Sequence, residues 1–298
     1  MYDLHHLKGR TYYIDGPTNC GVYILNDDNE CVLIDCGTAL EGPIIETVLR
    51  RNKLKLKYLV NTHSHADHSG SNVYLMKMTG CTVIASKIER AFLRDSKLDI
   101  GFLYGGYPID EFDTKLMHID DQKEIYALEQ LPEGLRSFKL PGHHYGQIGI
   151  RTSDGVYFIA DSVVSTELVA KSHVVLIYDI QGYLDSLDYV DGLKGNIIVP
   201  AHADVSTDLT ETIEFSRNKI HEICDVIIDY LSKEHTAEEV TAHIFEHYNL
   251  RISYNKYMLI MATIRSYLSY LGHERKVKNY FKDNKLVFIS MEAFEDKF

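Results

Sequence analysis

The chain has 298 residues, of which 45% are hydrophobic, and its formal net charge is −12. This length and composition are typical of a globular protein with one large domain or two modest ones. The acidic balance disfavours a broad nucleic-acid surface, because phosphate binding depends on clustered Lys and Arg. No apolar run approaches the roughly 20 residues that cross a bilayer. Residues 1 to 10 lack the apolar stretch of a secretory signal, so we expect neither a membrane segment nor export by that route.

The cysteines point to a reducing compartment. Their number is odd and no two are spaced as CxxC, so neither a disulfide framework nor a thiolate zinc site is predicted. They are Cys20, Cys31, Cys36, Cys81 and Cys224. Reduced thiols in the cytoplasm are the simpler interpretation.

The first half of the chain alternates short β-rich runs with helical patterns. Apolar and β-branched residues predict strands at 11–14, 21–25 and 31–34, a helix around 44–49, and a strand at 57–61. A helix containing Val73 and Met76 follows. The pattern Ser-x-x-Glu at residues 86–89 predicts a capping box at the start of the next helix. Strands recur at 137–140, 147–152, 156–160 and 197–199. This order predicts two sheets covered by helices.

A dense cluster of polar residues directly follows the strand at 57–61. Three histidines and an aspartate occur within six residues: His63, His65, Asp67 and His68. Imidazole nitrogen and carboxylate oxygen are ligands that a borderline cation such as zinc accepts. The cluster therefore predicts a metal site on a short turn after a strand.

Three further residues stand at comparable positions. His143 follows a Pro-Gly turn, Asp161 ends a strand-like run, and His202 follows another apolar run. Loops at strand ends present side chains to a common site. His144 competes with His143 for the inward position, and we favour His143 because it directly follows Pro141-Gly142.

With these residues the chain resembles the metallo-β-lactamase fold superfamily over about residues 10 to 205. The seven positions match, in order, the ligands of its dinuclear hydrolases: His63, His65, Asp67, His68, His143, Asp161 and His202. The resemblance implies an α+β fold, a four-layer αββα sandwich. It also implies two divalent ions, for which we expect zinc, with manganese or iron as alternatives.

The resemblance also assigns roles. His63, His65 and His143 would hold one ion, Asp67, His68 and His202 the other, and Asp161 would bridge both. Asp35 would support the site without binding metal. Asp67 would be the catalytic residue, orienting a water or relaying its proton.

Two ions about 3.5 to 4 Å apart can share a hydroxide near neutral pH and polarise a substrate oxygen. We expect a hydrolase of a small acyl ester, thioester or lactone. A phosphodiesterase of a small nucleotide, a diiron oxidoreductase and a non-catalytic metal-binding protein remain alternatives. Tyr145 could donate a hydrogen bond to the substrate or simply be a packed aromatic residue.

Two segments are candidate walls of a substrate site. Residues 95–125 combine glycines with large apolar side chains and would be either a lid or a packed connection. Residues 174–183 would be either a second wall or a strand and turn.

The chain beyond His202 changes to long helical patterns. Helices are predicted from Asp208, from a capping box at 236–239 and over 254–271, followed by a hairpin at 277–289. This order resembles the winged-helix-like tail of some members of the superfamily. We therefore expect a catalytic domain at 1–206 and a helical, winged-helix-like domain at 207–298. The tail has 12 basic and 15 acidic residues, so packing against the first domain or formation of a homo-oligomer is favoured over nucleic-acid binding.

Overall fold

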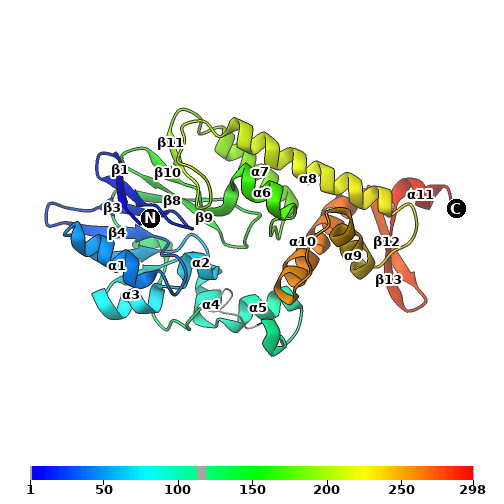
Figure 1. The fold of residues 1–298 in the computed structure, drawn as a ribbon, viewed down its shortest axis with the longest axis horizontal. Coiled ribbons are helices and arrows are strands. Elements are labelled where there is room, and N and C mark those ends of the chain that lie inside the picture. The colour runs from blue at the N-terminus through cyan, green and yellow to red at the C-terminus, as the bar shows by residue number, and fades with distance from the viewer. Residues whose placement is uncertain (1, 113–118, 298) are drawn as a thin grey trace.

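The N-terminal part of the chain forms a seven-stranded sheet (Figure 1). The computed structural model describes residues 2–112 and 119–297. The strands follow one another across the sheet in chain order: β1 (Leu4–Lys8), β2 (Thr11–Ile14), β3 (Cys20–Ile24), β4 (Glu30–Ile34), β5 (Lys55–Val60), β6 (Thr82–Ile84) and β7 (Ile125–Tyr126). The first four strands are antiparallel neighbours, and β4 to β7 pair in parallel.

A second sheet packs against the first. Its strands, in spatial order, are β11 (Ile197–Val199), β10 (Val156–Phe158), β9 (Ile148–Thr152) and β8 (Leu135–Lys139). Side chains alternate between the faces of a strand, and β4 shows how both faces are buried. Val32 and Ile34 join a core shared with Ile150 and Phe158 of the second sheet, whereas Leu33 lies in a core with Ile45 of a covering helix.

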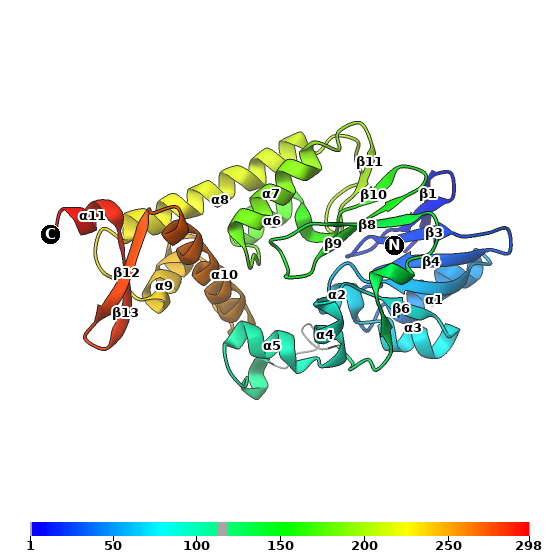
Figure 2. The ribbon, with the colours of Figure 1, turned by 180° about the vertical axis from the view of Figure 1, so that it is seen from behind.

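Helices cover the outer face of each sheet (Figure 2). On the seven-stranded side are α1 (Gly42–Arg51) and α3 (Asn72–Thr79), and α4 (Glu89–Arg94) lies beside β7, whereas α2 (Ala66–Ser69) lies at the edge of the sandwich (Figure 2). On the other side are α6 (Thr166–Ser172) and α7 (Ile180–Asp191). The four-layer sandwich predicted from the sequence is confirmed.

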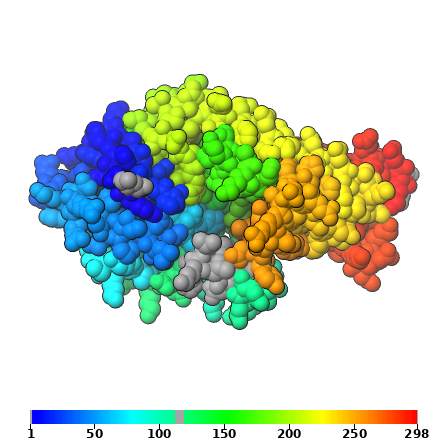
Figure 3. All heavy atoms as spheres, viewed as in Figure 1, coloured from blue at the N-terminus to red at the C-terminus, as the bar shows by residue number. Residues whose placement is uncertain are grey.

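Three long helices and a hairpin form the C-terminal part. They are α8 (Thr210–Tyr230), α9 (Ala237–His247), α10 (Tyr254–His273), β12 (Val277–Lys282) and β13 (Lys285–Ser290), followed by α11 (Met291–Glu295). The hairpin and α11 lie at the end of the molecule opposite the first sheet (Figure 3). The predicted capping box is formed, since Thr236 and Glu239 each accept the other's backbone N–H.

One hydrophobic core crosses the predicted boundary at 206 and 207. It joins Leu187 of α7 to Ile227 of α8 and Ile264 of α10. The helical tail is therefore packed against the sandwich through apolar contacts. The division into two domains, and the likeness of the tail to a winged helix, stay predictions.

The segment at 95–125 contains a helix, α5 (Lys97–Tyr104), which packs between α4 and α10. Part of this segment, residues 113–118, lies outside the described residues, so the choice between a lid and a packed connection stays open for it. The strand and turn considered for 174–183 are wrong, because α7 begins at Ile180. Asp179 caps that helix by accepting the N–H of Gly182, which explains the helical start.

Two expectations about composition can be compared with the structure. All five cysteines are buried and free. Within residues 2–112 and 119–297, no helix is long and apolar enough to cross a membrane.

Candidate metal centre

The seven predicted ligands converge where strands of the two sheets end. His63 and His65 lie between the end of β5 and the start of α2, which carries Asp67 and His68. Asp161 lies in a short turn after β10, and His202 follows β11, the neighbour of β10 in the same sheet. Loops from both sheets therefore meet at one edge of the sandwich.

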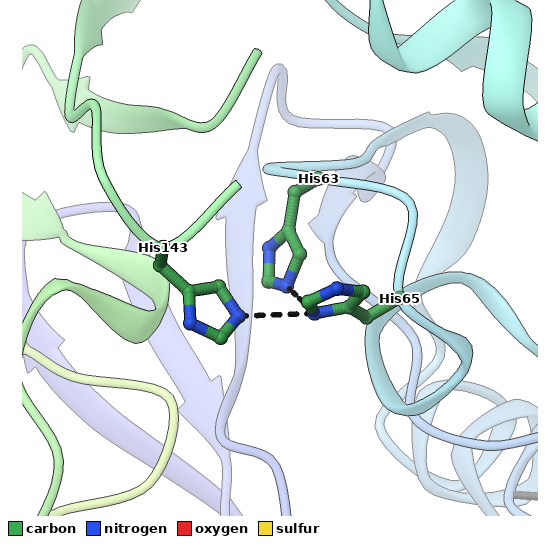
Figure 4. A group of neighbouring side chains, drawn as sticks. All are labelled: His63, His65 and His143. Carbon is green, nitrogen blue, oxygen red and sulfur yellow. Dashed lines mark hydrogen bonds between the residues drawn. The ribbon is translucent and has the colours of Figure 1, made fainter. Parts of the chain in front are cut away.

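Three histidines form the first group (Figure 4). Nδ1 of His65 lies 3.0 Å from Nε2 of His63 and 3.0 Å from Nε2 of His143. Three ring nitrogens thus point to one spot. This is the arrangement of nitrogen ligands around a single ion.

The second group surrounds Asp161. Nε2 of His68 lies 3.0 Å from Oδ1 of Asp161, and Nε2 of His202 lies 3.2 Å from Oδ2 of Asp67. The other oxygen of Asp161 lies 3.4 Å from Nε2 of His143 and 3.5 Å from Nε2 of His202. Asp161 therefore stands between the two groups, as expected for a bridging carboxylate.

Three of the histidine rings also contact a hydrogen-bond acceptor through Nδ1, the nitrogen that points away from the centre. Nδ1 of His68 lies 2.9 Å from Asp35, that of His143 lies 2.9 Å from the carbonyl of Leu176, and that of His202 lies 2.8 Å from the carbonyl of Pro17. Such contacts fix the ring orientation and leave Nε2 directed inward. The expected supporting role of Asp35 agrees with this contact, since the same carboxylate also accepts the N–H and hydroxyl of Thr62.

The electrostatics of the group suit cations. Burial lowers the pKa of His63 well below its usual range and that of His143 to about 3, so both rings are neutral and able to bind metal. Burial also lowers the pKa of His202, but Asp161 and Asp67 outweigh it and raise that pKa to about 10. These carboxylates attract positive charge.

Two buried atoms test whether the residues fit a metal. Nε2 of His68 and Oδ1 of Asp161 have no hydrogen-bond partner among the described residues, although they are 3.0 Å apart. Buried polar atoms without a partner are costly. A cation bound by both atoms would satisfy them, so the donor set fits the expected pair of divalent ions.

The Pro-Gly turn decides which of two adjacent histidines faces the centre. Gly142 has φ +116°, and a Cβ there would lie 2.2 Å from the backbone nitrogen of Tyr183. This tight turn directs His143 at the first group and turns His144 toward Glu89, whose carboxylate lies 2.7 Å from its Nδ1. The preference for His143 agrees with this geometry.

Two acidic residues beside the centre were not predicted as site residues. Glu89 is fully buried, and it accepts the backbone N–H of Ser64 and of Gly146, each at 2.8 Å. The capping box predicted at 86–89 is wrong, because α4 begins only at Glu89, its N-cap is Ile88, and the Glu89 carboxylate accepts backbone N–H groups of two other loops. Asp99 of α5 is also buried and lies 3.5 Å from His144. The only sequence feature that marks Asp99 is that it is an acidic residue among the mostly apolar residues of α5.

A cavity of about 480 Å³ includes Tyr145, two residues after His143, in its lining, but none of the seven candidate ligands lines it. Phe102, Tyr145 and Tyr178 contribute aromatic rings, and Arg265 of α10 lies farther along its wall. The ring of Tyr178 lies 5.4 Å from that of His144. The helical tail and α5 thus line a pocket whose residues Tyr145 and Tyr178 contact the ring of His144.

The sequence profile of the Metallo-beta-lactamase superfamily matches residues 13–202, well over half of the chain. The chain belongs to the metallo-beta-lactamase superfamily. It has the fold and the clustered His and Asp residues described above.

Individual relatives match shorter stretches. A probable metallo-hydrolase of Methanocaldococcus jannaschii is 29% identical over 126 residues, which cover 40% of this chain and 56% of that protein. Hydroxyacylglutathione hydrolase of Methylococcus capsulatus is 35% identical over 69 residues, covering 23% and 27%. The chain therefore spans little more than half of the first relative and about a quarter of the second.

A solved structure supports the fold over nearly the whole chain. A beta-lactamase domain protein from Burkholderia ambifaria superposes with a TM-score of 0.72 at 14% identity, covering 97% of this chain and 93% of that one. At this identity the likeness shows the fold alone, including the helical C-terminal region.

The ion pair of His144 predicts a pH-dependent stability. Burial lowers the pKa of His144, but the neighbouring carboxylates of Asp99 and Glu89 raise it from 6.5 to about 9. Because the folded pKa lies above the unfolded value, this stabilisation is complete below about pH 6.5 and is lost as the pH rises through about 9. In chelator-treated protein, His144→Gln should therefore lower the free energy of unfolding by roughly 3 kcal/mol more at about pH 6 than at about pH 10.

Urea unfolding of both proteins at the two pH values measures this difference. An equal loss at both would show that His144 is not held as a cation.

Proposed function

We propose that this protein is a metallo-hydrolase that cleaves a small acyl ester, thioester or lactone with the help of two divalent ions, for which we favour zinc. The observation that carries the proposal is the convergence of seven nitrogen and oxygen donors on two adjacent groups, with Asp161 between them. His63, His65 and His143 would hold one ion, and Asp67, His68 and His202 the other. When bound, such ions make water a nucleophile near neutral pH and polarise a substrate oxygen.

Asp67 is our candidate for the catalytic residue. Its side chain is 44% exposed, whereas those of His68 and Asp161 are almost completely buried. Attraction to His68 and His202 lowers its pKa although burial raises it, so the carboxylate is ionised. An ionised carboxylate at the open side of the centre can accept a proton from an attacking water and return it to the solvent or the leaving group.

The neighbouring cavity supports a small, partly apolar substrate. The rings of Phe102 and Tyr145 meet edge to face at 5.0 Å, and both side chains are about half exposed. Burial and the charge of Asp179 raise the pKa of Tyr145, so its hydroxyl keeps its proton and can donate to a substrate oxygen. We therefore favour the substrate-facing role for Tyr145 over simple packing.

The proposal also covers the cellular location, the substrate class and the self-association of the protein. The buried free thiols support a reducing, cytoplasmic location. The acidic tail supports a small-molecule substrate rather than a nucleic acid, and leaves self-association through the C-terminal helices as its second use.

Turnover of an acyl-ester panel tests the proposal. Protein loaded with zinc or manganese should hydrolyse at least one ester, thioester or lactone faster than a chromogenic phosphodiester. Asp161→Ala should reduce this turnover to background, because the carboxylate between the two groups is lost. Asp225→Ala, at an exposed position of α8, is the matched control and should retain full turnover.

Unchanged turnover in Asp161→Ala would remove the assignment. A preference for the phosphodiester would replace the acyl substrate with the alternative one.

The aromatic wall predicts a separate effect on substrate binding. Phe102→Ala should raise KM about tenfold with a smaller change in kcat, because it removes apolar area from the cavity and leaves the donors in place. Tyr107→Ala is the matched control, since Tyr107 belongs to the same segment but is 80% exposed and outside the cavity lining. Steady-state kinetics on the best panel substrate measures both. Equal KM values in wild type and Phe102→Ala would place the substrate elsewhere.

A further inference from the structure

A chain of buried side chains lies beside His65 of the first group. It runs from Glu89 of α4 through His144 to Asp99 of α5, and the His144 ring meets that of His65 at 4.7 Å. The side chains of Glu89 and His144 are fully buried, and that of Asp99 is 10% exposed. No step proposed above uses these residues.

Glu89 ties together the two loops that carry the first group. One of its oxygens accepts the N–H of Ser64, which lies between His63 and His65. The other accepts the N–H of Gly146 and a contact from His144, which lie three residues and one residue after His143 in the chain. A buried carboxylate with several donors is strongly held, so the spacing of the two loops depends on it.

Asp99 lies close to His65. One donor atom each from His65, Asp99 and His144 lie within 4.8 Å of one another. Nε2 of His65, Nε2 of His144 and Oδ1 of Asp99 are all buried and have no hydrogen-bond partner among the described residues. Three unsatisfied atoms that gather at one place require a common explanation.

The tautomer of His65 supplies that explanation. Its Nδ1 is directed at the nitrogens of His63 and His143, where a bound cation requires a free lone pair. The ring proton must then be on Nε2, the buried nitrogen that has no partner. A carboxylate is the acceptor that usually receives this proton behind a metal-binding histidine, and it fixes the ring.

We propose that Asp99 is a positioning residue that accepts the Nε2–H of His65 and thereby orients this ligand, with His144 and Glu89 holding Asp99 and the ligand loops in register. The inference rests on the proposed metal set. It also links two parts of the molecule, because α5 carries Phe102 in the cavity wall as well as Asp99. The wall of the cavity and the orientation of His65 are then set by the same helix.

The experiment compares zinc binding by full-length wild type, Asp99→Ala and Asp99→Asn. Competition with a chromogenic chelator should show that Asp99→Ala binds one of its two ions about 10 to 100 times more weakly than wild type. Asp99→Asn keeps an oxygen acceptor and should lose less. Asp110→Asn changes an exposed carboxylate of the same segment and should bind zinc as wild type does.

Cobalt substitution gives a second readout that a merely structural role would not move. The visible absorption of the cobalt-loaded protein should shift in Asp99→Ala, because the orientation of a ligand ring changes, and should return toward wild type in Asp99→Asn. Far-UV circular dichroism and melting of the metal-free proteins check that each variant folds. If Asp99→Ala does not fold, Asp99→Asn alone must show the weaker binding.

Equal zinc affinity and an equal cobalt spectrum in a folded Asp99→Ala would overturn the inference. Three zinc ions in wild type and two in Asp99→Ala would also overturn it, since the cluster would then be a cation site of its own. A wild type that binds no metal would contradict the proposed function as well, which separates that failure from the first two.

Discussion

Imidazole nitrogens that face one another at 3.0 Å in a buried site cannot all carry protons, and carboxylates placed among them need positive charge. Shared cations satisfy both requirements, and the surrounding structure is arranged to keep the donors in place. Asp35, the carbonyl of Leu176 and the carbonyl of Pro17 hold rings of the centre from outside. The centre therefore depends on contacts from both halves of the sandwich.

The two sheets explain how such distant residues meet. Parallel pairing places the ends of β4 and β5 side by side, so that Asp35 and the loop with His63 lie together. In the second sheet, parallel pairing places the ends of β10 and β11 side by side, so that Asp161 and His202 lie together. The helical tail adds α10 to the cavity wall beside α5. The sandwich therefore brings the candidate ligands together, and α5 and α10 supply lining residues of the cavity.

The order of strands and helices could be predicted from the sequence, and the seven candidate ligands could be proposed because they follow strand-like runs and match the motifs of the family that the chain resembles. The missed residues lacked such a signal. Glu89 matched a local capping pattern, but its carboxylate satisfies backbone N–H groups of two distant loops instead. Asp99 is one acidic residue in an apolar helix, and its partners lie about 35 and 45 residues away in the chain. Long-range polar contacts of this kind produce no periodic pattern in the amino-acid sequence.

The central claim is that two ions are bound by the two groups of donors joined by Asp161. Crystals of protein purified with zinc, measured across the zinc absorption edge, test it most directly. We expect two anomalous peaks, one among His63, His65 and His143 and one among Asp67, His68 and His202. A single peak, or a second peak away from His202 and Asp161, would contradict it.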